Sequence, residues 1–304
     1  MGNKIFYYTD FNTFTLILEN GTLRFKESTA SNDCLDTKLV YSQLKQIANK
    51  QLEKDSCSEA LKFIYEFNKY KDFTDDRICL VSCFTTKEDS RLLWDAYTMN
   101  RKDRKSEKYN GVCIEFDENK IKELLENVGD EYVFKTLEPI MYGDGKIFTF
   151  LNDSLKEYLW EYYELKNDED QHQDIVPTIT VELFGGKVMT IDLQKCIVLP
   201  AVKLIKKIEN YSPLFKHDFW KEESEIRAVL SVNKEKMKSI NIHKTDNDYY
   251  YDLGINNDCI KKVILGPEFN DEEIEQLKNL KGKIDFSLLK VERSNGTNVI
   301  RSNK

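Results

Sequence analysis

Two glutamates and an arginine in one short segment are the residues best suited to chemistry. Glu223, Glu225 and Arg227 alternate along the stretch EESEIRAVL. If this stretch is a β-strand, the three side chains share one face, because successive side chains of a strand point to opposite faces. Two carboxylates are costly to bury without a purpose, and a guanidinium beside one of them favours its ionised form. The pattern predicts an acid–base or hydrogen-bonding site, and the alternative is a solvated edge strand with cross-strand ion pairs.

A second group of polar and aromatic residues lies at the end of the apolar run RICLVSCF and in the segment that follows it. The run is typical of a strand buried on both faces, and RLLWDAY predicts a helix that opens near Thr86 and Asp89. The residues of this region that could line a binding site are Ser82, Phe84, Trp94 and Tyr97. Aromatic residues in such positions pack more often in a core than against a ligand.

Two further candidates lie in predicted loops. Asn32 and Asp33 follow a strand, where such residues most often form turns. Residues 100–110 carry five basic and two acidic side chains and could contact a phosphate, although a solvated loop explains them as well. The sequence has no GxGxxG, GxxxxGK, HExxH or GxSxG motif. Its three His and seven Cys include no CxxC pair, so no metal site is expected.

Composition sets limits on the class of protein. The chain has 304 residues, a net charge of -8 and 12% aromatic residues, which excludes a disordered protein and argues against a duplex-DNA binder. Its 12 Gly and 5 Pro predict few tight turns and several long helices. No stretch approaches the roughly 18 apolar residues of a membrane span, and the start does not resemble a secretory signal. Scattered cysteines are typical of a reducing compartment, so we expect a cytoplasmic protein with no membrane partner.

Hydrophobic periodicity predicts the elements that position these residues. Strands are expected in KIFYY, TLRF, RICLVSCF, GVCIEF, residues 136–142, EIRAVLSV, CIKKVILG and KIDFSLLKV. Helices are expected in FNTFTLILEN, twice within residues 38–71, in KIKELLENV, over residues 151–166, in IVLPAVKLIKKI and in DEEIEQLKNL. Gly21 is expected to cap the C-terminus of the first helix, and Pro200 to interrupt or open IVLPAVKLIKKI. The strands and helices do not alternate regularly. We therefore predict an α+β fold: a single domain over residues 1–292 with a central mixed or antiparallel sheet, a helical insertion at about 38–72, and a frayed tail at 293–304.

Taken in order, these segments resemble a bacterial domain family of unknown function, family 2971. The resemblance spans roughly residues 6–290 and rests on Tyr8-Thr9 with LILENGTLRF, Asn32-Asp33, CFT with Asp89, Trp94 and Tyr97, GVCIEFD, the block from Phe215 to Arg227 and VILG. Two features depart from the family. Cys34 stands where relatives usually have proline, and the stretch between Tyr97 and Gly111 is longer than usual.

The layout is also similar in outline to the ADP-ribosyltransferase superfamily, and this similarity implies an NAD site. It would place Tyr8 and Thr9 on a first strand, Ser82 to Thr85 on a middle strand, and Glu223 with Glu225 on a late strand. One carboxylate would stabilise the oxocarbenium-like ribose formed when the nicotinamide bond breaks, as in glycoside hydrolysis, and the other would deprotonate the nucleophile. Phe84, Trp94 or Tyr97 would stack on the nicotinamide ring, whereas Arg227 could instead neutralise Glu225.

Three functional hypotheses follow. The first is an NAD-binding ADP-ribosyltransferase or NAD glycohydrolase, in the setting of a bacterial toxin or phage-defence effector, with an unknown macromolecular target. The second is a non-catalytic sensor that binds a small nucleotide or a protein. The third is a metal-dependent nuclease, which ranks last because two glutamates are too few ligands and Arg227 repels a cation.

Overall fold

The structure is a computed structural model that describes residues 4–28, 39–54, 58–67, 77–98, 109–169, 178–183, 187–192, 195–245 and 248–298. Its internal contacts divide the chain into two compact units. The first, which we call the sheet unit, comprises residues 1–32, 76–140 and 219–304, and the second, the helical unit, comprises residues 33–75 and 141–218. The single domain expected from the sequence stays a prediction, and the two units are described separately.

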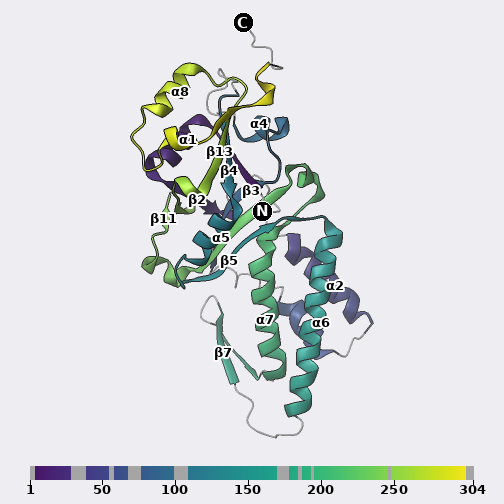
Figure 1. Ribbon diagram of the computed structural model, residues 1–304. Helices are drawn as coiled ribbons and strands as arrows, with labels where there is room; N and C mark the ends of the chain where they lie inside the picture. The colour runs from purple at the N-terminus through teal and green to yellow at the C-terminus, as the bar shows by residue number, and fades with distance from the viewer. Residues whose placement is uncertain are drawn as a thin grey trace. The chain divides into compact units, whose positions relative to one another are not determined.

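The sheet unit is built on one open ten-stranded sheet (Figure 1). Its strands are β1 (Lys4–Thr9), β2 (Thr22–Glu27), β3 (Arg77–Thr85), β4 (Val112–Asp117), β5 (Tyr132–Pro139), β10 (Glu225–Asn233), β11 (His243–Lys244), β12 (Tyr249–Gly254), β13 (Ile260–Leu265) and β14 (Val291–Arg293). The strand order is β11-β12-β2-β3-β1-β4-β13-β14, and β10 pairs with both β3 and β5. Within this sheet, strands β13 and β14 are parallel and the other pairs are antiparallel, so the predicted α+β class with a mixed central sheet is confirmed.

Helices cover both faces of this sheet. The helices of the unit are α1 (Phe11–Asn20), α4 (Arg91–Tyr97), α5 (Glu118–Glu126) and α8 (Asp271–Lys278), with 3-10 turns η4 (Asp218–Glu223), η5 (Lys234–Ser239), η6 (Asn257–Cys259), η7 (Phe286–Leu288) and η8 (Asn295–Asn298). Buried residues of α1, α5 and α8 join the main hydrophobic core on one face, which we call the core face. Helix α4 packs with Phe6, Tyr8, Cys113 and Ile264 on the other face, which we call the α4 face.

The central strands are mostly apolar because both of their faces are buried. In β4, Ile114 belongs to the main core, whereas its neighbour Cys113 packs on the α4 face. The same alternation separates Ile5 from Phe6 in β1. A continuous apolar run is the expected signature of such a strand, and the prediction for GVCIEF is confirmed.

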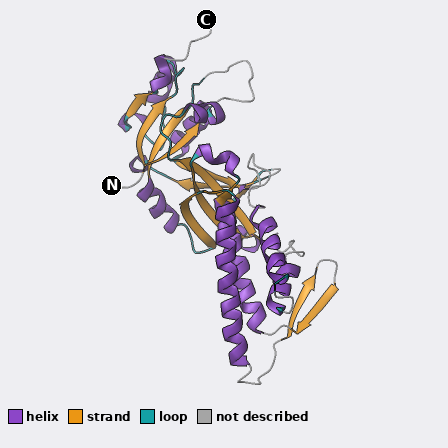
Figure 2. Cartoon of the chain, turned by 90° about the vertical axis from the view of Figure 1, so that its right-hand side faces the viewer, coloured by secondary structure: helices purple, strands orange, loops and turns teal. Residues whose placement is uncertain are grey.

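The helical unit contains four helices and two strand pairs in its described residues. These are α2 (Leu39–Leu52), α3 (Glu59–Phe67), α6 (Asp144–Glu169) and α7 (Lys195–Tyr211), β6 (Met141–Tyr142) with β9 (Phe215–Lys216), and β7 (Thr178–Leu183) with β8 (Lys187–Asp192); the turn η3 spans Ser212–Leu214. Helices α6 and α7 run alongside each other (Figure 2). Leu44, Ile64, Leu151 and Leu204 are buried in the hydrophobic core of this unit. No helix in the described residues has the length and apolar character needed to cross a membrane.

Several predicted boundaries differ from the structure. Helix α7 continues through Pro200 and is not interrupted there. The long aromatic helix begins at Asp144, before the predicted start at residue 151. The predicted strand KIDFSLLKV is instead the turn η7 followed by the short β14, because the Asp285 carboxylate accepts hydrogen bonds from the Ser287 backbone N–H at 2.9 Å and caps a turn.

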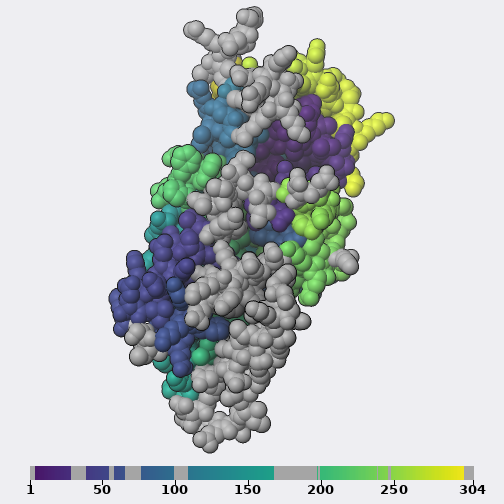
Figure 3. All heavy atoms as spheres, turned by 180° about the vertical axis from the view of Figure 1, so that it is seen from behind, coloured from purple at the N-terminus to yellow at the C-terminus, as the bar shows by residue number. Residues whose placement is uncertain are grey.

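The beginning and the end of the sheet unit's sequence pack together. Helix α1 ends at Gly21 in the left-handed conformation, with φ of 58°, as the sequence predicts. The backbone N–H groups of Lys283 and Ile284 then donate to Glu19 and Leu18 at 3.2 and 3.0 Å. Figure 3 shows N-terminal atoms (purple) and C-terminal atoms (yellow) side by side on one face.

We expect the substitution Gly111→Ala to destabilise the fold, because the backbone is tightly packed where β4 begins. A Cβ at this position would lie 2.4 Å from the Thr9 carbonyl oxygen and 2.4 Å from the Thr98 Cβ. Overpacking of this kind costs about 1–3 kcal/mol of unfolding free energy, which urea denaturation measures. Gly254→Ala is the control, because no heavy atom of the described residues, apart from its chain neighbours, lies within 4 Å of the Cβ it would add. Equal losses in the two variants would contradict the prediction.

Candidate functional site

A buried ion pair on β10 lies at the centre of the candidate site. The Arg227 Nε donates to Glu225 Oε1 at 2.9 Å. Arg227 is 1% exposed and Glu225 is 5% exposed. Strand β10 is flanked by β3 and β5, so that Arg227 stands opposite Cys83 on one side and Glu138 on the other. The pair therefore lies within the sheet and is not the solvated edge ladder considered as the alternative.

Glu223 does not share the strand with Glu225 and Arg227, and this part of the sequence prediction is wrong. Glu223 is the last residue of η4, and Ser224 follows in the left-handed region with φ of 46°. The Thr85 hydroxyl donates to the Glu223 carbonyl oxygen at 2.6 Å, and the Thr86 N–H donates to the Ser224 carbonyl at 3.2 Å. These bonds to the end of β3 hold a turn where the sequence pattern predicts regular alternation.

Tyr97, in α4, contacts the Glu223 carboxylate. Its hydroxyl donates to Glu223 Oε1 at 2.6 Å, and the phenol is 41% exposed while Glu223 is 9% exposed. Burial, the hydrogen bond to Glu223 and the nearby acidic groups of Cys83 and Glu225 raise the pKa of Tyr97 above its usual 10. Three residues predicted for the site, Tyr97, Glu223 and Glu225, thus lie close together, with Cys83 beside them.

Tyr8 and Trp94 lie on the same face but are used for packing. The Tyr8 hydroxyl donates to the Lys87 carbonyl at 3.1 Å and accepts from the Ser90 N–H at 2.7 Å. Burial raises the pKa of this phenol. The Tyr8 ring meets the Trp94 ring edge to face at 4.9 Å, and both side chains are buried. These two residues hold the start of α4, and their ring faces are covered.

Thr9, Ser82 and Phe84 lie on the core face, so the structure does not bring them together with Glu223 and Glu225, and their role in an NAD site stays a prediction. The register pairs Phe84 with Ile226 and Ser82 with Ala228, which places both on the core face. Phe84 packs edge to face against Phe116 at 5.8 Å. The Ser82 hydroxyl is buried without a hydrogen-bond partner in the described part of the chain. Thr9 pairs in register with Val112 of the main core.

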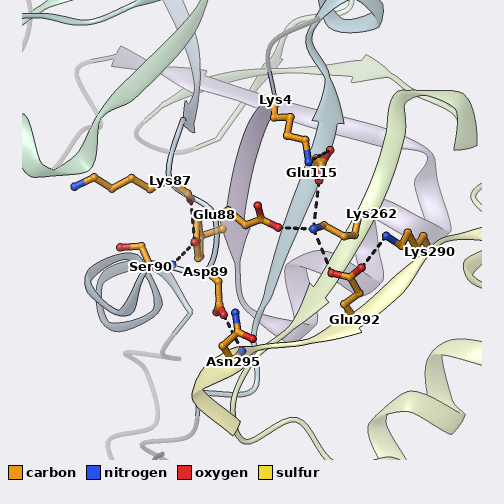
Figure 4. Close-up of polar contacts among 11 residues, drawn as sticks. Lys4, Lys87, Glu88, Asp89, Ser90, Glu115, Lys262, Lys290, Glu292 and Asn295 are labelled. Atoms are coloured by element: carbon orange, nitrogen blue, oxygen red, sulfur yellow. Dashed lines mark hydrogen bonds and ion pairs between the residues drawn. The ribbon is translucent and has the colours of Figure 1, made fainter. Parts of the chain in front are cut away.

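Lys262, which was not among the residues predicted for the site, anchors a charged network on the α4 face (Figure 4). Its ammonium lies 3.5 Å from Glu115 Oε2 and 3.2 Å from Glu292 Oε2, and also contacts Glu88. Burial lowers the pKa of Lys262, but the carboxylates of Glu88 and Glu292 outweigh it and raise that pKa. The available signal was a lysine inside the apolar run CIKKVILG, opposite a glutamate inside GVCIEF. The network fastens the loop between β3 and α4 to β4, β13 and β14.

The described residues contain no group of three or more His, Cys, Asp or Glu side chains that could hold a metal ion. Two sequence candidates, Asn32-Asp33 and most of the basic segment 100–110, lie outside the residues that the structure describes.

We expect Tyr97→Phe to reduce the loss of stability at alkaline pH. The folded protein keeps the Tyr97 proton above pH 10, where an unfolded chain begins to lose it. The stability from this difference is fully present below pH 10 and is lost as the pH rises above it. The unfolding free energy of the variant should therefore fall less steeply in urea titrations from about pH 9 to 11.5. Tyr163→Phe, at a half-exposed site, is the control, and equal slopes in the two variants would refute the prediction.

The candidate site falls within a segment that matches a known family. Residues 93–228 match the family described as "Protein of unknown function (DUF2971)". No curated protein and no solved structure matches the chain. The matched segment runs from α4 into β10 and contains Tyr97, Glu223, Glu225 and Arg227. The outline similarity to ADP-ribosyltransferases stays a prediction. Over the segment that carries the candidate site, the chain is similar to DUF2971, which supports the family resemblance drawn from its sequence.

Proposed function

We propose that the protein binds NAD and breaks its nicotinamide–ribose bond, as an ADP-ribosyltransferase or an NAD glycohydrolase. The observation that carries the proposal is the arrangement of two carboxylates with different partners beside one phenol. Glu225 is bonded to the Arg227 guanidinium, and Glu223 accepts a hydrogen bond from Tyr97. Pairs of titratable groups in different environments are the usual basis for dividing acid–base roles in an active site.

The two glutamates would act at different stages of the reaction. The Arg227 contact favours the ionised form of Glu225, which would accept hydrogen bonds from ribose hydroxyls and stabilise positive charge on the sugar. The C1′–N bond breaks and its electron pair leaves with nicotinamide. Water or a target hydroxyl then forms the new bond to C1′, and its proton passes to Glu223.

Access to these groups would come from the side of Tyr97. Tyr97 is 41% exposed, whereas Phe84 and Trp94 are each 2% exposed and are packed in hydrophobic clusters. Of the three aromatic residues expected to stack on nicotinamide, Tyr97 is therefore the one that we assign to the ligand. A protein that consumes NAD in this way would suit a bacterial toxin or phage-defence effector.

A second candidate is a sensor that binds a nucleotide without turning it over. The burial of Arg227 favours it, because a guanidinium that is 1% exposed and bonded to Glu225 can serve a purely structural purpose. In this case the same face would bind the ligand, and the ion pair would hold β10 in register.

Incubation of the purified protein with NAD separates these functions. We expect release of nicotinamide, together with free ADP-ribose for a glycohydrolase or protein-bound ADP-ribose for a transferase. Calorimetric binding of NAD without any product would identify the sensor. Neither binding nor product would contradict both proposals.

A further inference from the structure

The Asp89 carboxylate joins two segments of the sheet unit, α4 and the residues that follow β14. Its Oδ1 accepts from the Trp94 indole N–H at 2.8 Å and from the Ser294 hydroxyl at 2.6 Å. Its Oδ2 accepts from the Asn295 backbone N–H at 2.8 Å. Hydrogen bonds to a carboxylate are stronger than those between neutral groups. These three bonds therefore hold Asp89 firmly to α4 and to residues 294–295. Figure 4 shows Asp89 directed at Asn295.

The backbone of Asp89 is held in an uncommon conformation. Its φ is 48°, in the left-handed region that residues other than glycine visit rarely. Such a residue persists only where its surroundings determine it, and such residues cluster near functional sites. Here its neighbours are fixed as well, because Glu88 contacts Lys262 and the Ser90 N–H donates to the Tyr8 hydroxyl.

The segment that bonds to the Asp89 carboxylate through Ser294 and Asn295 is anchored to the sheet. The Ser294 N–H donates to the Leu265 carbonyl at 2.9 Å, directly after β14 pairs with β13. The Ser294 hydroxyl also accepts from the Gly296 N–H at 3.0 Å, and Ser294 is 4% exposed. Residues 294–298, within the segment expected from the sequence to fray, thus form an ordered turn against Asp89.

Asp89 also contacts α4, the helix that carries Tyr97 of the candidate site. Trp94 lies three residues before Tyr97 in α4, so the two side chains leave the same side of the helix. The indole is fixed at its N–H by Asp89 and at its ring by Tyr8. Further along this helix, the Tyr97 hydroxyl donates to Glu223.

We infer that Asp89, clamped by Ser294 and Asn295, is a positioning residue that sets α4 so that Tyr97 meets Glu223. The inference rests on the proposed function for its catalytic consequence, although the structural coupling can be measured without NAD. The segment after β14 then helps to position α4 without contacting the candidate site, and loosening it releases the Tyr97–Glu223 contact.

The test uses amide hydrogen exchange on the full chain. Asp89→Asn and Ser294→Ala each remove part of the clamp. We expect exchange to become about tenfold faster over residues 91–98 and 219–225, because a hydrogen bond to a charged group is lost. Ser294→Thr keeps a hydroxyl and should restore slow exchange. In turnover assays, Ser294→Ala should lower kcat with NAD and Ser294→Thr should not.

Asp285→Asn is the matched control, because the Asp285 carboxylate also accepts two hydrogen bonds, at 2.9 and 2.6 Å from Ser287, and caps the distant turn η7. Unchanged exchange over residues 219–225 in Asp89→Asn and Ser294→Ala would overturn the inference. Equal acceleration throughout the sheet unit, with the same pattern in Asp285→Asn, would also overturn it. If the wild-type protein releases no nicotinamide, the proposed function fails, while the exchange pattern still decides the positioning role.

Discussion

The substitution Arg227→Ala is expected to lower the unfolding free energy by about 3–5 kcal/mol, because it leaves a buried carboxylate without its partner. Glu225 and Arg227 are 5% and 1% exposed, so water cannot replace the lost guanidinium without opening the sheet. Urea denaturation followed by circular dichroism measures the loss. The double variant Glu225→Gln with Arg227→Met should lose less, since it removes both charges of the pair together.

Arg24→Ala supplies the comparison for this prediction. Arg24 pairs with Asp252 at 2.8 Å, but its side chain is 49% exposed. Surface pairs of this kind contribute about 0–1 kcal/mol. If Arg227→Ala lowers the unfolding free energy by no more than Arg24→Ala does, the ion pair on β10 is hydrated in solution and its description as a buried pair is wrong.

The substitution Glu223→Gln is expected to reduce kcat for NAD by about 10²–10⁴-fold, the usual contribution of a general base. The amide can still accept the Tyr97 hydrogen bond, so stability and NAD binding should change little. Glu222→Gln is the matched control, because Glu222 is the adjacent carboxylate and contacts Lys87 at the surface. Release of nicotinamide under saturating NAD measures the effect. Equal rates in the two variants would remove Glu223 from the mechanism.

The sequence predicts the elements that are continuous apolar runs. Strands β3 and β4 were expected from RICLVSCF and GVCIEF because burial on both faces makes most of their positions apolar. Helix α1 was expected with its Gly21 cap for an equally local reason. These signals need no knowledge of what each segment packs against.

Features that depend on distant partners could not be predicted in this way. Strand β12, Tyr249–Gly254, was missed because its pairing with β2 comes from the opposite end of the chain. The left-handed Ser224 that displaces Glu223 from β10 is fixed by bonds to Thr85 and Thr86, more than a hundred residues earlier. Local alternation therefore predicts one face for Glu223, Glu225 and Arg227 where the structure has a turn.

The candidate site also combines residues that local sequence predicts with placements that depend on distant partners. Glu225, Arg227 and Tyr97 were chosen by residue type and do lie together. The face to which Ser82 and Phe84 point depends on the register of β3 against β10, which no local pattern contains. Asp89 was expected only as part of a helix start, because its bonds to Ser294 and Asn295 join residues about two hundred positions apart.

The most direct test of the central claim is nicotinamide release by the wild-type protein and by Glu225→Gln at matched concentration, with NAD binding measured on both. We predict that the wild type releases nicotinamide, and that Glu225→Gln binds NAD but releases none. Equal release by the two proteins, or no binding of NAD by the wild type, would contradict the account.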